Sequence, residues 1–460
     1  MQTQMTAIEV AGQNISNVNT KGYSRQTADI TTSPDVQSSV GSEGTGTTVT
    51  SIDQVVSQLL NSQIQSQSST SGYWSGQQSA LQSAQDAVNE YLSGTSTSST
   101  SSTTASSDTS SSGLSTLLNN FFSAFSSLAT SNSSSNQQAT VNAAQNLANS
   151  FNNIDSALSS VRSSLNDTIT SGVSSANQLL TNIAGLNQEI NNAEAGGGNA
   201  NDLRDEREQD LENLSDLTTI NTSTSSNGAV NVAIGGQTLV SGYTVNDTLQ
   251  TYDAGSGQLM VQTASGGVQL TLTGGSIQGT INARDNTLAT VQGNLNTLAN
   301  TVISQVNNVL DNGYNSTGGT GNTFFTGSDA SSIAVNATMA NNPALIQISG
   351  SSTSSGDTSL ALQVSDLSNT AQSALNNQTF SGSYVSTITD LGTALDDANT
   401  EVTDQTTVSD MLSTQRSSVS GVNLDEEMTN LMSYQRAYEA SANVVTTINT
   451  LLGDTMNLKS

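Results

Sequence analysis

The fold is decided by two stretches, MTAIEVAGQNISNVNTKGYSRQ (Met5–Gln26) and GVNLDEEMTNLMSYQRAYEASANVVTTINTLLGDTMNLKS (Gly421–Ser460), at opposite ends of the 460-residue chain. Each stretch places apolar residues at alternating steps of four and three, which is the spacing of a helix with one apolar seam. A lone helix of this kind cannot bury its seam in water, so it must pair. We therefore expect the two ends to form a coiled coil with each other, with neighbouring copies, or with both.

The candidate packing residues lie along these two seams and in the turn after the first helix. We expect that helix to end near Asn17, because Gly22 can take a positive φ and asparagine amides can cap the freed carbonyls. Periodicity alone does not say whether the partner helix belongs to the same chain or to a neighbour. The assembly residues predicted in this way are Met5, Ile8, Ile15, Asn17, Asn19, Gly22, Tyr23, Leu424, Met428, Leu431, Tyr438, Ala442, Val445 and Leu452.

The charge balance limits the partners. The chain has 37 acidic and 9 basic residues, a formal net charge of −28, and only 33% hydrophobic residues. A surface this acidic repels nucleic acid and anionic lipid, so we expect neither as a partner. No apolar run reaches membrane-spanning length, and no basic-then-apolar signal peptide opens the sequence. Membrane insertion is therefore not expected.

The residue types also restrict the chemistry. The chain contains no Cys and no His, which excludes Cys or Ser–His nucleophiles, imidazole acid–base catalysis and the usual zinc sites. The carboxylate run Asp425–Glu427 fits the acidic start of a helix better than a metal site. Asp205, Glu206 and Glu208 fit a salt-bridged helix face, with Arg204 and Arg207 at i,i+3 and i,i+4 spacing. We therefore predict no catalytic residue, no cofactor and no metal.

The middle of the chain changes its hydrophobic period twice. Helical stripes fill 51–220, broken by Gly196–Gly198, and alternation with paired glycines then predicts a small antiparallel β domain at 221–280. Helical spacing returns from Arg284, and two more long helices are expected at Leu360–Asn377 and Tyr384–Ser417. The pattern predicts strand and loop at Thr27–Ile52 and irregular or partly β structure at Phe324–Ser349. The low-complexity composition of Ser93–Gly113 predicts a flexible loop.

These patterns predict a mainly α fold with an inserted small antiparallel β domain. We expect it to be elongated and multi-domain, with a central bundle of long helices and the terminal helices pairing as a coiled coil. The predicted divisions are the N-terminal helix and turn at 1–50, the first part of the bundle at 51–220, the β insert at 221–280, the second part of the bundle at 281–418, and the C-terminal helix at 419–460.

Several motifs carry a family resemblance. AGQNISNVNTKGYSRQ resembles the N-terminal signature of the bacterial flagellar axial proteins (rod, hook and hook-associated), and GVNLDEEMTNLMSYQRAYEASANVVTTINTLL resembles their shared C-terminal helix. Three further segments narrow the resemblance to the hook-associated members found at the hook–filament junction. They are NDLRDEREQDLENLSDLTTI (Asn201–Ile220), FFTG followed by VNATMANNPALIQIS (within Phe324–Ser349), and SVSGVNLDEE (Ser418–Glu427).

The resemblance implies a structural role in filament assembly and motility. It implies self-association in a helical ring, with hook protein on one side and an adjacent hook-associated protein on the other. It also implies export by the flagellar secretion apparatus without a cleaved signal peptide, a cytosolic export chaperone on the C-terminal helix, and an extracellular place at the junction. The family usually has further residues before the segment that begins here at Met1, and the β insert is short for the family.

Other functions stay open from the sequence. A hook or rod protein would share the two ends but lack the NDLRDERE and FFTG segments. A secreted adhesin with a helical stalk and a β head would need a signal peptide or an anchor. A hydrolase would need two carboxylates facing each other in a cleft, and nothing in the sequence places such a pair.

Overall fold

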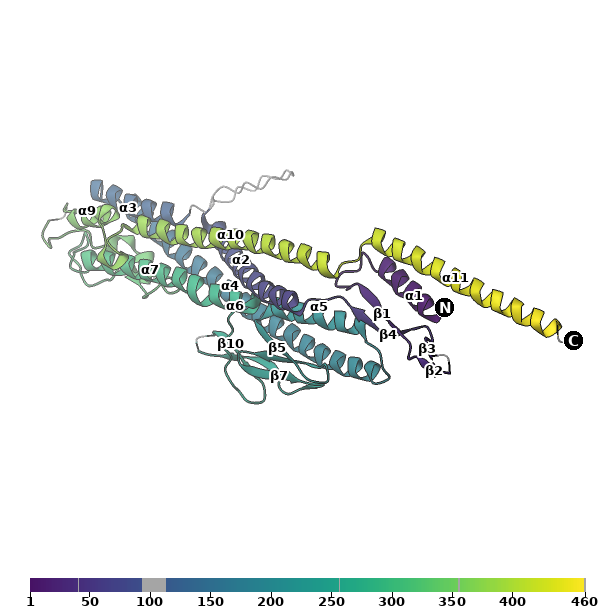
Figure 1. Cartoon of the computed structure of the whole chain (residues 1–460). Helices are drawn as coiled ribbons and strands as arrows, with labels where there is room; N and C mark the ends of the chain where they lie inside the picture. The colour runs from purple at the N-terminus through teal and green to yellow at the C-terminus, as the bar shows by residue number, and fades with distance from the viewer. Residues whose placement is uncertain (40, 93–112, 256, 355, 459–460) are drawn as a thin grey trace. The chain divides into compact units, whose positions relative to one another are not determined.

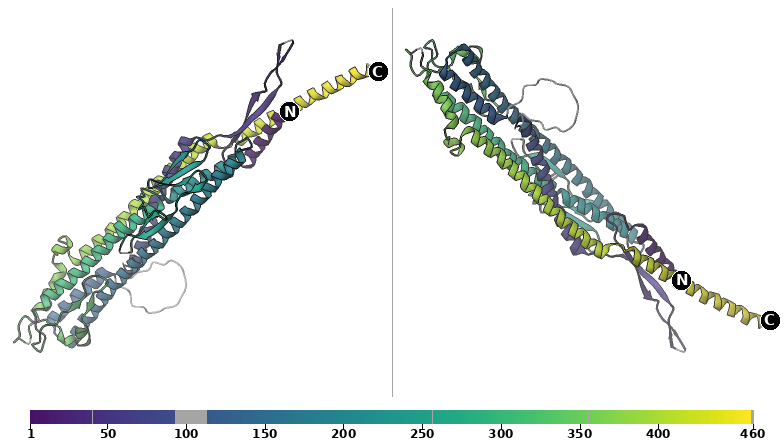
Figure 2. Two further views of the ribbon diagram at one scale, coloured as in Figure 1. Left: turned by 90° about the horizontal axis from the view of Figure 1, so that it is seen from below. Right: turned by 90° about the horizontal axis from the view of Figure 1, so that it is seen from above.

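The structure is a computed structural model that describes residues 1–39, 41–92, 113–255, 257–354 and 356–458. Its helices and strands are drawn in Figures 1 and 2. The chain forms two compact units. Unit 1 comprises Met1–Trp74, Thr170–Gln278 and Val402–Ser460, and unit 2 comprises Ser75–Ile169 and Gly279–Glu401. Three helices contribute residues to both units: α2 (Gln58–Leu92), α4 (Ser134–Glu194) and α10 (Phe380–Ser420).

The two ends of the chain meet in unit 1. Helix α1 (Gln2–Ser16) packs against α11 (Leu424–Asn457), and a hairpin follows α1. Its strands β1 (Gln26–Thr32) and β4 (Thr47–Gln54) pair antiparallel, with a bulge between Asp29 and Ile30. The short strands β2 (Val36–Ser38) and β3 (Gly41–Glu43) extend the hairpin. The strand content expected for this segment is confirmed.

The β insert also belongs to unit 1 and follows helix α5 (Asn201–Leu217). A four-stranded antiparallel meander contains β5 (Ile220–Thr224), β6 (Val230–Ile234), β7 (Gln237–Ser241) and β8 (Thr244–Val245), and a hairpin joins β9 (Leu249–Asp253) to β10 (Leu259–Thr263). Gly235 and Gly236 both take positive φ between β6 and β7, as a two-residue hairpin turn requires. The predicted antiparallel insert is confirmed.

Unit 2 is built on an aromatic core. Helix α3 (Leu114–Thr130) buries Phe121 and Phe125, whose rings contact Phe324 and Phe325. The latter pair lies at the start of an irregular segment that contains β11 (Phe325–Thr326), β12 (Ala334–Val335), α8 (Ala337–Asn341) and a 3-10 turn at Pro343–Leu345. Aromatic pairs of this kind contribute packing energy beyond their buried area. The prediction of an irregular, partly β segment with buried phenylalanines is confirmed.

Two predictions of helix bounds were wrong. The helix expected at Leu360–Asn377 is only α9 (Ser359–Asp366), followed by 3-10 turns at Leu367–Asn369 and Ser373–Leu375. Asn376 and Asn377 take φ of 54° and 60°, the left-handed conformation that asparagine tolerates and that a helix cannot continue through. The helix expected from Arg284 begins earlier, as α6 (Gly275–Asn282), a π-helical turn (Ala283–Leu288) and α7 (Ala289–Leu310).

The helix expected at Tyr384–Ser417 is confirmed as α10. The low-complexity segment 93–112 lies outside the described residues. The five domain divisions, the elongated shape and the coiled-coil geometry stay predictions. Among the residues that the structure describes, none of the helices is apolar over the length needed to cross a membrane.

Candidate functional site

The paired ends of unit 1 form the candidate site, and its first part is the buried face of α1. Thr3, Ala7, Val10 and Asn14 recur at steps of four and three and are buried, together with Ala11. Part of this face lies on the β1–β4 hairpin, where Thr3 Oγ1 donates to the carbonyl of Thr47 at 2.8 Å. The face that α1 buries within its own chain is therefore shifted from the predicted seam and includes polar residues.

The predicted seam of α1 lies nearer the surface. Met5 is 51% exposed, and Ile8 and Ile15 are half-buried. Sequence reasoning chose these positions because it counted apolar residues only. The structure gives the interior face to small and hydrogen-bonding side chains and leaves the larger seam residues partly free for other contacts.

Helix α11 uses only its first half to contact α1. Leu431, Tyr438 and Ala442 of the predicted stripe are half-buried, but Leu424, Met428, Val445 and Leu452 are exposed. From Asn443 to Leu458 every residue is exposed, and Figure 1 shows α11 running on past the end of α1. This half carries a set of large apolar side chains: Val444, Val445, Ile448, Leu451, Leu452, Met456 and Leu458.

The start of α11 explains the carboxylate run. Asn423 caps the helix, and its side chain accepts from the N–H groups of Asp425 and Glu426. Glu426 pairs with Arg25 at 3.3 Å, whereas Glu427 is buried. Negative charge in a first helical turn is favoured by the helix dipole, so the interpretation as a helix start holds. No group of acidic residues in the described parts of the chain has the arrangement of a metal site.

The turn between α1 and β1, which we call the anchor turn (residues 17–25), is held by one buried amide. Asn14 Oδ1 accepts from the hydroxyl of Tyr23 and from the N–H of Gln26, both at 2.9 Å. Asn14 Nδ2 donates to the Gln26 carbonyl at 2.8 Å. Gly22 takes a φ of 85°, as the turn was expected to require.

The remaining predicted residues of the anchor turn have smaller roles. The amide of Asn17 donates to the Gln13 carbonyl and accepts from Thr20 Oγ1, so it caps the end of α1 as expected. Asn19 is exposed. The backbone N–H of Arg25 donates to the Ser420 carbonyl at 2.8 Å, which ties the anchor turn to the last residue of α10.

Helix α5 supplies carboxylates to the anchor turn. Asp205 accepts from the N–H of Ser24 at 2.8 Å, and Asp202 accepts from the side chain of Gln26 at 2.9 Å. Burial raises the pKa of Asp205, although the Ser24 hydrogen bonds oppose this shift. Burial and the nearby carboxylates together raise the pKa of Tyr23 well above its usual range, so its hydroxyl stays protonated and donates to Asn14.

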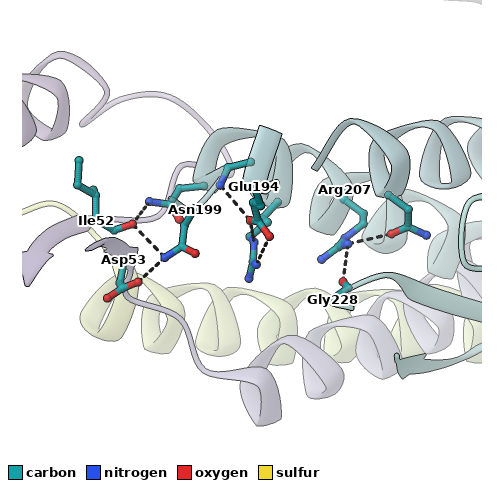
Figure 3. Close-up of polar contacts among 10 residues, drawn as sticks. Ile52, Asp53, Glu194, Asn199, Arg207 and Gly228 are labelled. Carbon is teal, nitrogen blue, oxygen red and sulfur yellow. Dashed lines mark hydrogen bonds and ion pairs between the residues drawn. The ribbon is translucent and has the colours of Figure 1, made fainter. Parts of the chain in front are cut away.

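The arginines of α5 bind other elements, so the prediction of ion pairs along the helix was wrong. Arg204 makes a two-bonded ion pair with Glu194 at the end of α4, at 2.8 and 2.9 Å. Arg207 donates to the side chain of Asn187 and to the Gly228 carbonyl. Figure 3 shows these contacts beside Asn199, which donates to Ile52 and Asp53 in β4. Helix α5 therefore clamps together α4, the hairpin and the β insert.

A polar groove of about 560 Å³ lies beside this clamp, lined by the anchor turn, α5 and the last turns of α10. Glu212 of α5 pairs there with Arg416 of α10. Glu208 accepts from Gln65 of α2 at 2.8 Å, and burial raises its pKa. Of the charged groups that line the groove, Glu212 and Arg416 pair with each other, Glu208 is bonded to a neutral amide, and Lys21 has no hydrogen-bond or ion-pair partner in the described residues.

Sequence reasoning missed the residues that hold the anchor turn. These residues are Asn14, Asp202 and Arg25. Their side chains are polar, so a search for apolar seams does not select them. A signal was present, since all three lie within the motifs that carry the family resemblance. The partners of Asp202 and Arg25 are distant in the chain, and only the structure identifies them, whereas Asn14 binds Tyr23 and Gln26 of its own motif.

Comparisons with known proteins address the class of this protein. Residues 98–325 match the model of the flagellar hook-associated protein FlgK helical domain, and residues 413–458 match that of the flagellar basal body rod FlgEFG protein C-terminal region. The second range covers the end of α10 and all of α11. These matches define the chain as a flagellar axial protein. Within that class, the chain belongs to the hook-associated FlgK family.

Curated relatives agree over part of the chain. Flagellar hook-associated protein 1 of Salmonella typhimurium is 41% identical over 83 residues, which is 18% of this chain and 15% of that protein. The Escherichia coli K12 protein of the same name is 34% identical over 94 residues, which is 20% of this chain and 17% of that protein. The matches thus span less than a fifth of the length of either relative.

The fold has a counterpart among solved structures. The flagellar hook junction protein FlgK from Burkholderia pseudomallei superposes with a TM-score of 0.64 at 16% identity, covering 78% of this chain and all of that one. At this identity the likeness concerns the fold. It agrees with the mainly helical architecture and the inserted antiparallel strands.

Proposed function

We propose that this protein is a structural subunit of the bacterial flagellum, forms the junction between hook and filament, and is required for filament assembly and motility. The observation that carries the proposal is the match of residues 98–325 to the hook-associated helical domain, because the C-terminal match is shared with rod proteins. The role is structural, and the protein catalyses no reaction. The fold of the Burkholderia junction protein supports this assignment.

The proposed mechanism of assembly is burial of the terminal helices between copies. The exposed apolar side chains of α11 gain about 25 cal/mol for each Å² removed from water. Copies arranged in a helical ring would bury them in every contact. Hook protein would bind one side of the ring and an adjacent hook-associated protein the other.

The same surface supports a proposal about the route to the junction. A helix that exposes Ile448, Leu451 and Leu452 is an aggregation hazard before assembly. A cytosolic export chaperone that covers α11 would remove the hazard. The chain would then leave through the flagellar secretion apparatus without a cleaved signal peptide and stay extracellular in the flagellum.

The test is a deletion strain examined by swimming assays and electron microscopy. We expect hooks without filaments, flagellin shed into the medium, and recovery on complementation with the full-length gene. Filaments of normal length on the deletion strain would overturn the proposal.

A matched pair of variants tests the role of α11. Leu452→Asp places a charge on the exposed apolar set and should abolish complementation. Asn449→Asp adds the same charge at an exposed polar position of the same helix and should complement. Measurement of both proteins in the medium separates a defect of assembly from a defect of export.

A further inference from the structure

The chain has few basic side chains, and most of them bond to another side chain of the same compact unit. Six of the nine make a hydrogen bond or an ion pair with another side chain of their own unit: Arg25, Arg162, Arg204, Arg207, Arg284 and Arg416. Lys459 lies outside the described residues. In the part of the chain that the structure describes, this leaves Lys21 and Arg436 with no hydrogen-bond or ion-pair partner for the side chain.

Arg436 lies on the face of α11 that points away from the half-buried stripe. It ends an exposed row at intervals of four: Met428 is 49% exposed, Met432 is 48% exposed, and Arg436 follows. Side chains at this interval form one ridge on a helix surface. The ridge is thus two methionines and one positive charge.

The neighbouring helix α1 carries the matching ridge. Met1, directly before the first residue of α1, and Met5 are 44% and 51% exposed, and Glu9, which is also exposed, follows at the same interval. Glu9 is the one ionisable side chain in α1. Within the described residues, its carboxylate makes no hydrogen bond or ion pair. The two ridges are therefore alike in their methionines and opposite in their charge.

From these two ridges we infer that Arg436 of one copy pairs with Glu9 of the adjacent copy, with the methionines of both ridges packed around the pair. The inference rests on the proposed self-association in a ring and names the contact that sets its register. The partner is a second copy of this chain. We call the two ridges, Met1–Met5–Glu9 and Met428–Met432–Arg436, the charged methionine ridges.

The charge balance of the chain favours a second copy as the partner. Copies that each carry a formal charge of −28 repel one another, so a contact between them needs a place where opposite charges meet. Arg436 supplies one of the few positive charges left for that purpose. Methionine side chains adapt to irregular surfaces, which suits a contact repeated with small differences around a helical assembly.

The geometry of unit 1 is compatible with this pairing. The anchor turn after α1 is tied to Ser420 at the end of α10 and to Glu426 in the first turn of α11, so α1 and α11 run antiparallel (Figure 2). When two copies with the same orientation lie side by side, α1 of one copy can lie against α11 of the next. These two helices are then antiparallel, as they are within one chain. Glu9 belongs to α1 and Arg436 to the first half of α11, and these two helices contact each other within the chain.

The first experiment is disulfide trapping, which the absence of native cysteine makes clean. Two variants, Glu9→Cys and Arg436→Cys, are expressed together in the deletion strain, and isolated flagella are oxidised. Because each chain carries one cysteine, only a bond between different copies links the two substitutions. We expect a covalent dimer whose proteolytic fragments join the α1 and α11 peptides. Pairing Arg436→Cys with Asp410→Cys, an exposed position on α10, should give no dimer.

The second experiment is a charge swap scored by motility and filament count. Glu9→Arg and Arg436→Glu each place like charges together and should each reduce motility. The double variant restores both the pair and the net charge and should recover it. Full motility of both single variants, failure of the double variant to recover, or a dimer absent from assembled flagella would each overturn the inference. None of these outcomes overturns the junction role, which fails instead when the deletion strain grows normal filaments.

Discussion

Asn14 holds the backbone of Gln26 with both polar atoms of its amide: Nδ2 donates to the Gln26 carbonyl at 2.8 Å, and Oδ1 accepts from the Gln26 N–H at 2.9 Å. The amide is 1% exposed, so its hydrogen bonds are formed away from water. The same oxygen also accepts from the hydroxyl of Tyr23. One residue of α1 therefore fixes both the path of the anchor turn and the start of β1.

Asn14→Ala should destabilise unit 1 by about 3 kcal/mol, because it leaves buried donors and acceptors without partners. Thermal unfolding followed by circular dichroism measures this loss, and hydrogen exchange at the Gln26 amide locates it. The control Asn19→Ala removes an exposed amide of the same turn and should change stability by less than about 0.5 kcal/mol. Unchanged exchange at Gln26 in the Asn14 variant would show that the amide does not hold the turn.

Replacing two helical glycines by alanine should change the free energy of unfolding in opposite directions. A Cβ on Gly72 of α2 would lie 2.1 Å from the carbonyl oxygen of Asp216, so the backbones of α2 and α5 approach too closely for any side chain. Gly72→Ala should therefore cost about 1–3 kcal/mol through overpacking. A Cβ on Gly185 of α4 meets nothing within 4 Å, so Gly185→Ala should stabilise by about 1 kcal/mol through helix propensity. Urea unfolding of both variants measures the two changes in stability. Equal changes would contradict the close approach of the α2 and α5 backbones at Gly72.

The hydrophobic period predicted the elements of this fold better than the contacts between them. The change of period at Asn221 located the β insert, and the pair Gly235-Gly236 located the turn between β6 and β7. Apolar periodicity failed at α1, because the face against the hairpin is made of Thr3, Asn14 and small residues. It also failed for Leu360–Asn377, where the helix ends at Asp366, 3-10 turns follow, and Asn376 and Asn377 are left-handed.

The contacts of the candidate site were not predictable from spacing along one element. Arg204 and Arg207 have acidic neighbours within α5, yet their partners lie in α4 and the β insert. Asp205 instead accepts from Ser24, 181 residues away in the chain. Local spacing shows which pairs a helix permits, but exposed pairs of that kind contribute little, and tertiary contacts replace them here.

Glu208→Gln should stabilise unit 1 at neutral pH. Burial raises the folded-state pKa of Glu208 above its ordinary value of 4.5, so the folded chain holds this proton more tightly than the unfolded chain does. Its contribution to stability is therefore complete below the unfolded pKa and is lost as the pH rises through the folded pKa. Glutamine is neutral throughout and keeps an oxygen that accepts from Gln65.

The melting temperature measured from pH 3.5 to pH 8 tests this expectation. The variant should melt higher than the native chain at pH 7, and the difference should close as the pH falls below about 4.5. Glu206→Gln is the control, because it removes an equal charge from an exposed position of the same helix. An equal gain in both variants would mean that relief of the net charge, rather than burial of Glu208, is the cause.

The two halves of α11 should exchange their amide hydrogens at different rates in a dilute monomer. Residues from Glu427 to Ala442 include a half-buried stripe against α1, whereas those from Asn443 to Leu458 are exposed on every face. An isolated helix of this length is marginal in water, because few hydrogen bonds offset the cost of nucleation. We expect the second half to exchange far faster than the first, and to slow sharply in assembled flagella. Equal protection of both halves in the monomer would contradict this expectation, because it would require a cover for the apolar side chains that does not come from neighbouring copies.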